Sequence, residues 1–249
     1  MLIYVILFSL FGMQIVYADQ IQDLKTGVLS ECIQCDLRGA DFKKANLTGV
    51  NLEGANLEGA RFHRAILNDA NLNNSNLVNA NLNLAQFRRA TFIGANLTGA
   101  LLYEAKGSRA NFRFAKLINS RMQKSRLTLA SFEGANIEGT FLNSARLNNS
   151  NFKSATLTNV NMNEASLGRV NFSEADIKYL SLVGGKAANS NFSRATISFS
   201  DFWGADLRKA EFSEARIIES RFTKANTRGS SFSQATVSST LLPDGTFEK

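Results

Sequence analysis

The chain has 249 residues, of which 28 are Lys or Arg and 21 are Asp or Glu, giving a formal net charge of +7. One histidine and two cysteines leave few groups for acid–base, nucleophilic or metal chemistry, which argues against most enzyme classes. The moderately basic balance favours anionic partners over cationic ones.

The first segment, residues 1–18, has the pattern of a secretory signal peptide. An uncharged apolar run from Leu2 to Phe11 precedes small residues that predict cleavage between Ala18 and Asp19. The segment is shorter than the ~20 residues that a helix needs to cross a bilayer. We therefore expect an exported protein, in the periplasm or, for a photosynthetic source, in the thylakoid lumen. The alternative is a membrane anchor formed by an uncleaved N-terminus.

Residues 19–34 have the spacing of a short amphipathic helix. Ile21, Leu24, Val28 and Leu29 recur at helical intervals and predict one apolar side. A repeating structure leaves its first unit open, so this segment is expected to cap the base of the repeats that follow.

Residues 35–242 form one uninterrupted repeat. From Leu37 to Leu242 every fifth residue is a centre, and 39 of the 42 centres are Leu, Phe, Ile, Met or Val. A period of five matches neither the 3.6 of a helix nor the 2 of a strand. A short repeat sustained over this length predicts a solenoid, in which each unit is buried only against its neighbours.

The repeat units at residues 45–49 and 55–59 read A-N-L-T-G and A-N-L-E-G. This pattern closely resembles the pentapeptide repeat family over residues 35–242. The resemblance implies an all-β fold, a right-handed quadrilateral β-helix with four units per coil and about ten coils. The centre and the small residue two positions before it would point inward, while the other three residues face solvent.

In such a helix, residues twenty apart lie directly above one another, at about 4.8 Å per coil. One vertical column then holds eight successive phenylalanines, which are expected to stack inside the core: Phe92, Phe112, Phe132, Phe152, Phe172, Phe192, Phe212 and Phe232. Asparagines just before these centres are expected to form an amide ladder along the axis: Asn51, Asn71, Asn111, Asn151, Asn171 and Asn191.

Cys32 and Cys35 fall on inward positions of the repeat frame, at the start of the first coil. In an exported chain this predicts a disulfide that clamps the cap to the first coil. A helix followed by C-x-x-C and then the repeats is also a pattern associated with exported pentapeptide repeat proteins. The alternatives are a redox-active dithiol, which lacks the usual βαβ setting here, and a metal site, for which the distant His63 does not complete a ligand set.

Sorting the charged residues by column singles out one face, whose centres start at Leu47. We call it the Leu47 face, and name the other three faces Leu37, Phe42 and Leu52 in the same way. The Leu47 face has only Asp69 and Asp206 as acidic residues. Its basic residues are Arg88, Arg89, Lys106, Arg109, Arg126, Arg146, Arg169, Lys186, Arg208, Lys209 and Arg228.

Three of these, Lys106, Arg126 and Arg146, share one vertical row, and like charges directly opposite each other in a ladder are destabilising. The same column contains all three exceptions to the large-apolar rule, Gly107, Ala187 and Thr227, which predict a wall that is shallower, dented or locally irregular. We interpret this face as the candidate anion-binding surface. The alternative is a solvated surface that serves only solubility.

No residue constellation indicates catalysis, a metal or a cofactor. The chain therefore reads as an exported, non-catalytic scaffold or binding protein for an anionic partner: an acidic protein, a glycan or a lipid headgroup. Some pentapeptide repeat proteins mimic DNA with an acidic rod, bind topoisomerases and confer quinolone resistance. That is the alternative function, but the net charge here has the opposite sign. Nucleic acid itself is disfavoured by the expected export.

At the other end, Pro243, Asp244 and Gly245 stop the repeat, leaving residues 243–249 as a short tail. No capping helix follows. The last coil is thus expected to be open, and a dimer through this C-terminal coil is the predicted assembly.

Overall fold

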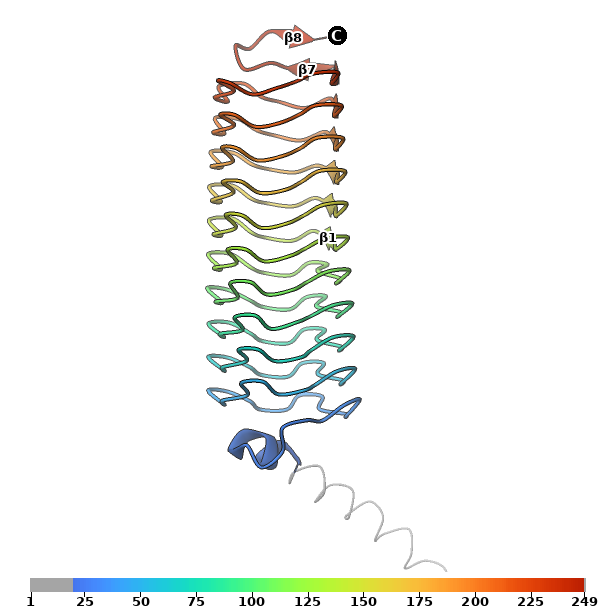
Figure 1. Ribbon diagram of the computed structural model, residues 1–249, viewed down its shortest axis with the longest axis vertical. Coiled ribbons are helices and arrows are strands. Elements are labelled where there is room, and N and C mark those ends of the chain that lie inside the picture. Colours follow the sequence, from blue (N-terminus) through green and yellow to red (C-terminus); the bar gives the residue numbers. More distant parts are fainter. Residues whose placement is uncertain (1–19, 249) are drawn as a thin grey trace, which may run out of the picture.

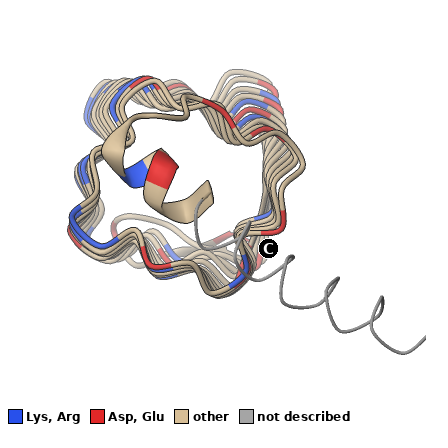
Figure 2. Cartoon of the chain, turned by 90° about the horizontal axis from the view of Figure 1, so that it is seen from below, with Lys and Arg blue, Asp and Glu red and all other residues tan. Residues whose placement is uncertain are grey.

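The computed structural model describes residues 20–248 and shows a four-sided parallel β-solenoid with one short helix at its base (Figure 1). Seen along the axis, the coils superpose as a square tube, and the helix lies across its lower opening (Figure 2). The proposed signal peptide and its cleavage site, Ala18 and Asp19, lie outside the described residues. Within the described chain, no helix has both the length and the apolar character needed to cross a bilayer.

The coil repeat is twenty residues. Parallel bridges join each residue just before a centre to its equivalent twenty positions later, from Glu31↔Asn51 to Arg221↔Leu241. On the Leu37 face the upper coils widen into a six-stranded parallel sheet in the order β1-β2-β3-β4-β5-β6. These strands are β1 (Asn136–Glu138), β2 (Thr156–Thr158), β3 (Asp176–Lys178), β4 (Thr196–Ser198), β5 (Arg216–Ile218) and β6 (Thr236–Ser238).

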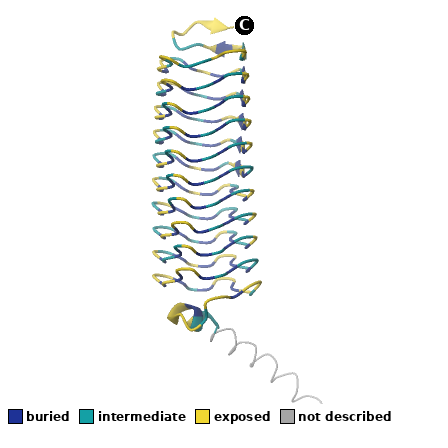
Figure 3. Ribbon diagram, in the orientation of Figure 1, coloured by how far each residue is buried: buried dark blue, intermediate teal, exposed yellow. Residues whose placement is uncertain are grey.

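The five-residue unit turns the chain through one corner and buries two side chains. The centre and the small residue two positions before it face the core along nearly the whole solenoid. The other three positions of the unit are partly or fully exposed (Figure 3). On most faces the centre's carbonyl accepts a hydrogen bond from the N–H three residues later, as between Leu37 and Ala40 at 3.1 Å. The last residue of the unit has a positive φ, for example 65° at Gly39 and 57° at Lys44. Glycine is suited to this conformation, but the solenoid imposes it on many other residues as well.

The phenylalanine column stacks as expected. Successive ring centroids from Phe92 to Phe232 are 4.5–5.0 Å apart, and the rings are close to parallel. The rings from Phe92 to Phe212 are fully buried, whereas Phe232 in the last coil is 37% exposed. The ladder is therefore core structure and not a ligand groove.

The asparagine ladder forms only in part. The amide of Asn71 donates to Asn51 Oδ1 at 2.9 Å, and that of Asn171 donates to Asn151 Oδ1 at 3.1 Å. Many of these side chains also accept the backbone N–H two residues later, as Asn111 does from Arg113 at 3.1 Å. The amides of Asn51, Asn71, Asn151 and Asn171 thus bond a neighbouring coil, whereas those of Asn111 and Asn191 serve the local turn.

The N-terminal cap is shorter than the expected segment. Residues 20–26 are helical, and Gly27 follows with a φ of 77°. Leu24 is buried, and Ile21 and Leu29 pack against the core. Val28, however, is 72% exposed, because the helix has already ended and the chain turns away there.

Cys32 and Cys35 are joined in a disulfide with their Cα atoms 5.5 Å apart. Their backbones belong to the first coil, since Cys32 N–H donates to the carbonyl of Asn51 and Asn56 N–H donates to that of Cys35, both at 2.8 Å. The bond therefore closes a small loop inside the first coil. The disulfide itself agrees with the sequence-based prediction, but it does not tie the helix to the first coil, and that part of the prediction is wrong.

The C-terminal segment is more ordered than a tail. After the last coil the chain reverses at Pro243, and β7 (Thr240–Leu241) pairs antiparallel with β8 (Phe247–Glu248). The turn is closed by hydrogen bonds between Leu242 and Thr246 and between Gly245 and Leu242, at 2.8 and 2.9 Å. Leu241 bridges Arg221, and the N–H of Phe222 donates to the carbonyl of Leu241 at 2.7 Å, so the hairpin extends the Phe42 face.

Candidate functional site: a basic face and its corner groove

The eleven basic residues of the Leu47 face are all exposed. The coil register sorts them into three vertical rows: the position before the centre (Lys106, Arg126, Arg146, Lys186), the position after it (Arg88, Arg208, Arg228) and the unit's last position (Arg89, Arg109, Arg169, Lys209). Lys106, Arg126 and Arg146 are consecutive bridge partners. We refer to these three residues as the cationic row.

Two of the eleven are neutralised by a carboxylate of the same face. Arg89 bonds Asp69 at 2.6 Å, and Arg208 bonds Asp206 at 2.7 Å. The hydrogen bond from Arg89 lowers the pKa of Asp69, and that from Arg208 does the same for Asp206. Both carboxylates therefore stay ionised to lower pH than a free aspartate, and these two arginines are already occupied.

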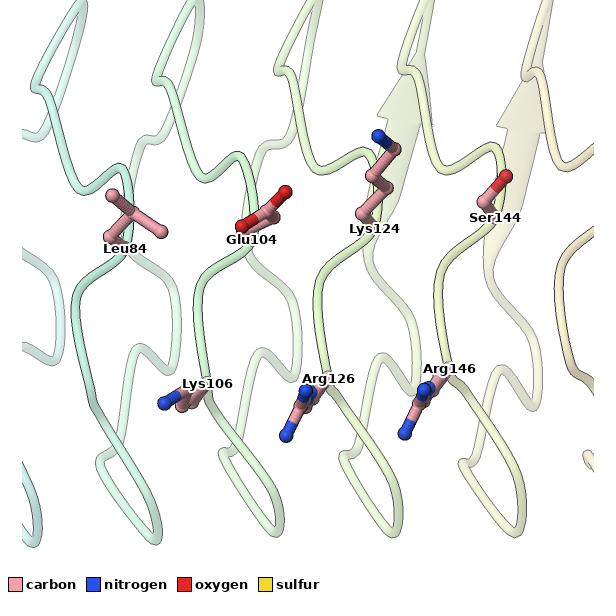
Figure 4. Close-up of a pocket in the computed structure, with 7 residues that line it drawn as sticks. All are labelled: Leu84, Glu104, Lys106, Lys124, Arg126, Ser144 and Arg146. Atoms are coloured by element: carbon pink, nitrogen blue, oxygen red, sulfur yellow. The ribbon is translucent and has the colours of Figure 1, made fainter.

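The cationic row is different. Among the described residues, no carboxylate lies within 4 Å of the charged groups of Lys106, Arg126 or Arg146. The three side chains extend from neighbouring coils in the same direction (Figure 4). Stacked strands lie about 4.8 Å apart, so three like charges are held close together without an internal counterion.

The row forms one wall of a groove that runs along the corner between the Phe42 and Leu47 faces. This corner groove has a volume of about 510 Å³. Its other wall is formed by residues at the last position of the Phe42 units: Leu84, Glu104, Lys124 and Ser144. Both walls are shown in Figure 4. The lining residues are Leu84, Glu104, Lys106, Lys124, Arg126, Ser144 and Arg146.

Between the walls lie Ala105, Ser125 and Ala145, whose side chains are buried in the core. Small inward residues at this corner leave only backbone at the groove floor. The hollow is therefore a direct consequence of the repeat, and the residues on its rims decide what it binds.

Lys124 connects the corner groove to a second hollow on the Phe42 face. Its ammonium lies 5.6 Å from the centroid of the Tyr103 ring, and hydrogen bonding to Tyr103 raises the pKa of Lys124. The second hollow has a volume of about 340 Å³ and carries three side-chain amides beside the aromatic ring. We call it the amide groove; it is lined by Asn83, Leu101, Tyr103, Arg121, Gln123, Lys124 and Asn143.

On the core side, the space expected to be left by Gly107 is filled, although a hollow of about 250 Å³ lies on the outer wall beside it, lined by Asn68, Gln86, Arg88, Lys106 and Ser108. The ring of Phe87 fills the space in front of this glycine, so that a Cβ added at Gly107 would lie 1.8 Å from Phe87 Cε2. Gly107 and Ala187 are both buried, and the bridges along this face continue without a break from Gln86 to Asn226. The centres of this face therefore vary in size, but the backbone of the face keeps the regular coil-to-coil pairing.

Sequence reasoning by faces located the cationic row but missed Tyr103, Glu104 and Lys124, which belong to the adjoining Phe42 face. The signal was present: Glu104 and Lys106 are two positions apart, on either side of a corner residue. The described residues contain no group of three or more His, Cys, Asp or Glu side chains arranged to hold a metal ion.

A four-sided solenoid of five-residue units defines a class of repeat protein, and comparison with known families agrees with it. The model of the family "Pentapeptide repeats" matches residues 30–64, 65–102, 110–149, 150–186 and 190–229. The chain therefore belongs to the pentapeptide repeat family. This match indicates no enzymatic family. A search of curated proteins found no match.

Among solved structures, the chain is similar to HetL, a pentapeptide repeat protein involved in heterocyst differentiation regulation from the cyanobacterium Nostoc sp. strain PCC 7120. The TM-score is 0.69 at 24% identity, covering 91% of this chain and 97% of HetL. At this identity the likeness extends to the fold alone.

Two further structures have lower TM-scores. QnrB1, a plasmid-mediated fluoroquinolone resistance protein, has a TM-score of 0.46 at 17% identity, covering 80% of this chain and 90% of QnrB1. A pentapeptide repeat protein from the Arabidopsis thaliana thylakoid lumen has a TM-score of 0.16 at 26% identity, covering 49% of this chain and 67% of that one. Neither carries an argument about this chain's function.

Proposed function

We propose that this protein is an exported, non-catalytic scaffold that binds an anionic partner through its Leu47 face. The single observation that carries the proposal is the cationic row, three exposed cations on consecutive coils with no carboxylate within ion-pair distance among the described residues. Like charges in register oppose folding, so a partner that neutralises them gains the free energy that this repulsion costs.

Export is supported by the disulfide between Cys32 and Cys35, because such bonds persist in oxidising compartments and are rare in the cytosol. It is also supported by the signal-like sequence of residues 1–18. The periplasm and the thylakoid lumen both fit these two features.

Mimicry of DNA for a topoisomerase would require an acidic rod. The cationic row, the remaining basic residues of the Leu47 face and the net charge of +7 all have the opposite sign. We therefore do not propose that function for this chain.

The test is binding to anionic polymers and vesicles as a function of salt. We expect affinity to fall steeply between low and physiological ionic strength, because exposed charges are screened within about 10 Å at 0.1 M salt. The double variant Arg126→Glu/Arg146→Glu should lose about tenfold or more in affinity at low salt.

The matched control is Lys116→Glu/Arg216→Glu, which makes the same change of net charge on the opposite, Leu37 face, where both side chains are exposed. It should bind nearly as the unmodified protein does. Equal loss in the two double variants would mean that only net charge matters, and no loss in either would rule out the Leu47 face as a binding surface.

A further inference from the structure

The corner groove and the amide groove adjoin each other and share Lys124. Together they present a line of cations, a row of side-chain amides and one exposed aromatic ring. This combination narrows the class of anion that fits, beyond the statement that the partner is negatively charged.

The first constraint is spacing. The cations of the row follow one another at the distance between stacked strands, about 4.8 Å. An acidic peptide in extended conformation places side chains on one face at about 6.6 Å intervals, twice the rise per residue. Such a peptide falls out of step with the row after one coil. A polysaccharide with one carboxylate on each sugar ring advances by roughly one coil step per ring, so its charges stay in step with the row when the glycosidic linkages turn successive carboxylates to the same side.

The second constraint is shape. The cationic row lines a hollow about 510 Å³ in volume, with a raised second wall formed by Leu84, Glu104, Lys124 and Ser144. A hollow between two walls accommodates a single extended chain along the axis, whereas a flat bilayer surface would contact the cationic row on the rim and leave the hollow itself unfilled. Arginine also suits carboxylates in particular, because its planar guanidinium can bind both carboxylate oxygens at once.

The third constraint is the chemistry beside the row. Gln123 and Asn143 offer amide donors and acceptors of the kind that bind hydroxyl groups. Asn83 offers its amide N–H groups, since its Oδ1 already accepts the backbone N–H of Tyr103 at 2.8 Å. Tyr103 stands in the same vertical row as these amides and is 38% exposed, so an apolar ring surface lies beside the polar groups. A uniform polyanion such as polyphosphate would have no use for these groups, whereas a sugar ring has both hydroxyls and an apolar face.

From these three constraints we infer that the corner groove and the amide groove form one binding site for an acidic polysaccharide of the uronic-acid type. Carboxylates pair with Lys106, Arg126 and Arg146, while the sugar hydroxyls and ring faces contact the amide groove and Tyr103. The inference rests on the proposed function, since it names the class of anion bound at that same face.

The chain provides its own control for the aromatic contribution. Trp203 and Lys224 form the same kind of pair on the same face, with the ammonium 5.1 Å from the ring centroid and Trp203 38% exposed. In those coils, however, Asp206 and Asn226 occupy the positions equivalent to the cationic row. The Trp203 pair is therefore an aromatic–lysine pair without a line of cations beside it.

The experiment measures binding of the full protein to polygalacturonate, poly-L-glutamate and vesicles containing phosphatidylglycerol, compared at equal anionic charge and at physiological salt. We expect polygalacturonate to bind at least tenfold more tightly than the other two. Arg126→Gln/Arg146→Gln should weaken polygalacturonate binding about tenfold, Tyr103→Ala about threefold, and Trp203→Ala not measurably. Circular dichroism would establish that each variant is folded.

Equal binding of the three probes would overturn the inference while leaving the proposed function intact, because binding would then depend on charge alone. Equal loss in Tyr103→Ala and Trp203→Ala would also overturn it, because the amide groove would have no special part. Unchanged binding in Arg126→Gln/Arg146→Gln would overturn both the inference and the proposed function.

Discussion

Phe87 occupies the space that the missing side chain of Gly107 leaves in the core. Its ring would lie 1.8 Å from a Cβ at Gly107, and it meets Phe92 and Phe112 edge-on, with centroids 5.4 and 6.0 Å away. Gly107, an exception to the apolar rule, is thus compensated by the bulky centre twenty positions earlier in the chain.

This relationship predicts that restoring the repeat consensus will harm the protein. Gly107→Leu replaces an exception with the commonest centre residue, yet it should lower the free energy of unfolding by about 1–3 kcal/mol because the core is overpacked. Chemical denaturation followed by circular dichroism would measure the change.

The compensating variant is Phe87→Leu/Gly107→Leu, which places a consensus leucine at both centres. It should recover most of the loss, and the sum of the two single effects should clearly exceed the effect of the pair. Additive effects would mean that the two positions do not share this space.

A second prediction concerns the stacked phenylalanines. Phe152 is fully buried between Phe132 and Phe172, with centroids 4.5 and 5.0 Å away. Phe152→Ala should cost about 3–5 kcal/mol, because it removes a large side chain from a core that cannot easily collapse.

The matched change is Phe232→Ala at the upper end of the same ladder, where the ring is partly exposed and has one stacked neighbour, Phe212. It should cost less than half as much. If both substitutions proved equally damaging, the last coil would have to be buried in solution by another surface.

The sequence was enough to predict the solenoid, because the period of five and the twenty-residue coil follow from the spacing of apolar centres alone. The phenylalanine ladder and the cationic row were predicted for the same reason: both depend only on which residues share a vertical line. The structure confirmed the resulting fold in its main features.

Features that depend on side-chain packing or on the ends were harder to predict. No pattern in the sequence indicates that Phe87 fills the place above Gly107, since that depends on a rotamer in a particular core. The corner groove was missed because charges were counted by face, whereas the groove combines Lys124 of one face with Arg126 of the next. Pro243 predicts the end of the repeat and a short tail after it. In the structure the chain reverses there instead, and β8 pairs with β7.

A third prediction follows from the place of the disulfide. Cys32 and Cys35 are only three positions apart, so the bond restricts a short loop and should contribute about 2 kcal/mol in the chain-entropy model. Because each coil of a solenoid contacts only its neighbours, this contribution is local to the base. Cys32→Ala/Cys35→Ala should therefore speed amide hydrogen exchange in residues 29–40 and leave exchange in the central coils unchanged. A uniform increase along the solenoid would show instead that the bond supports the whole fold.

The last prediction concerns the open end of the solenoid. Strand β6 is the final strand of the six-stranded sheet, and in the described chain no strand pairs with its outer edge. Val237 at its centre is only partly buried, and Phe232 of the same coil is 37% exposed. The hairpin of β7 and β8 extends the Phe42 face and not the Leu37 face that contains β6. An unpaired edge with apolar residues favours pairing with another chain, so we expect a dimer through this coil.

Light scattering should give twice the monomer mass, and Val237→Lys should give a monomer because a lysine at the edge opposes pairing. Val28→Lys, at the exposed valine beside the N-terminal cap, is the control that should remain dimeric. A monomeric mass for the unmodified protein at high concentration would contradict the prediction.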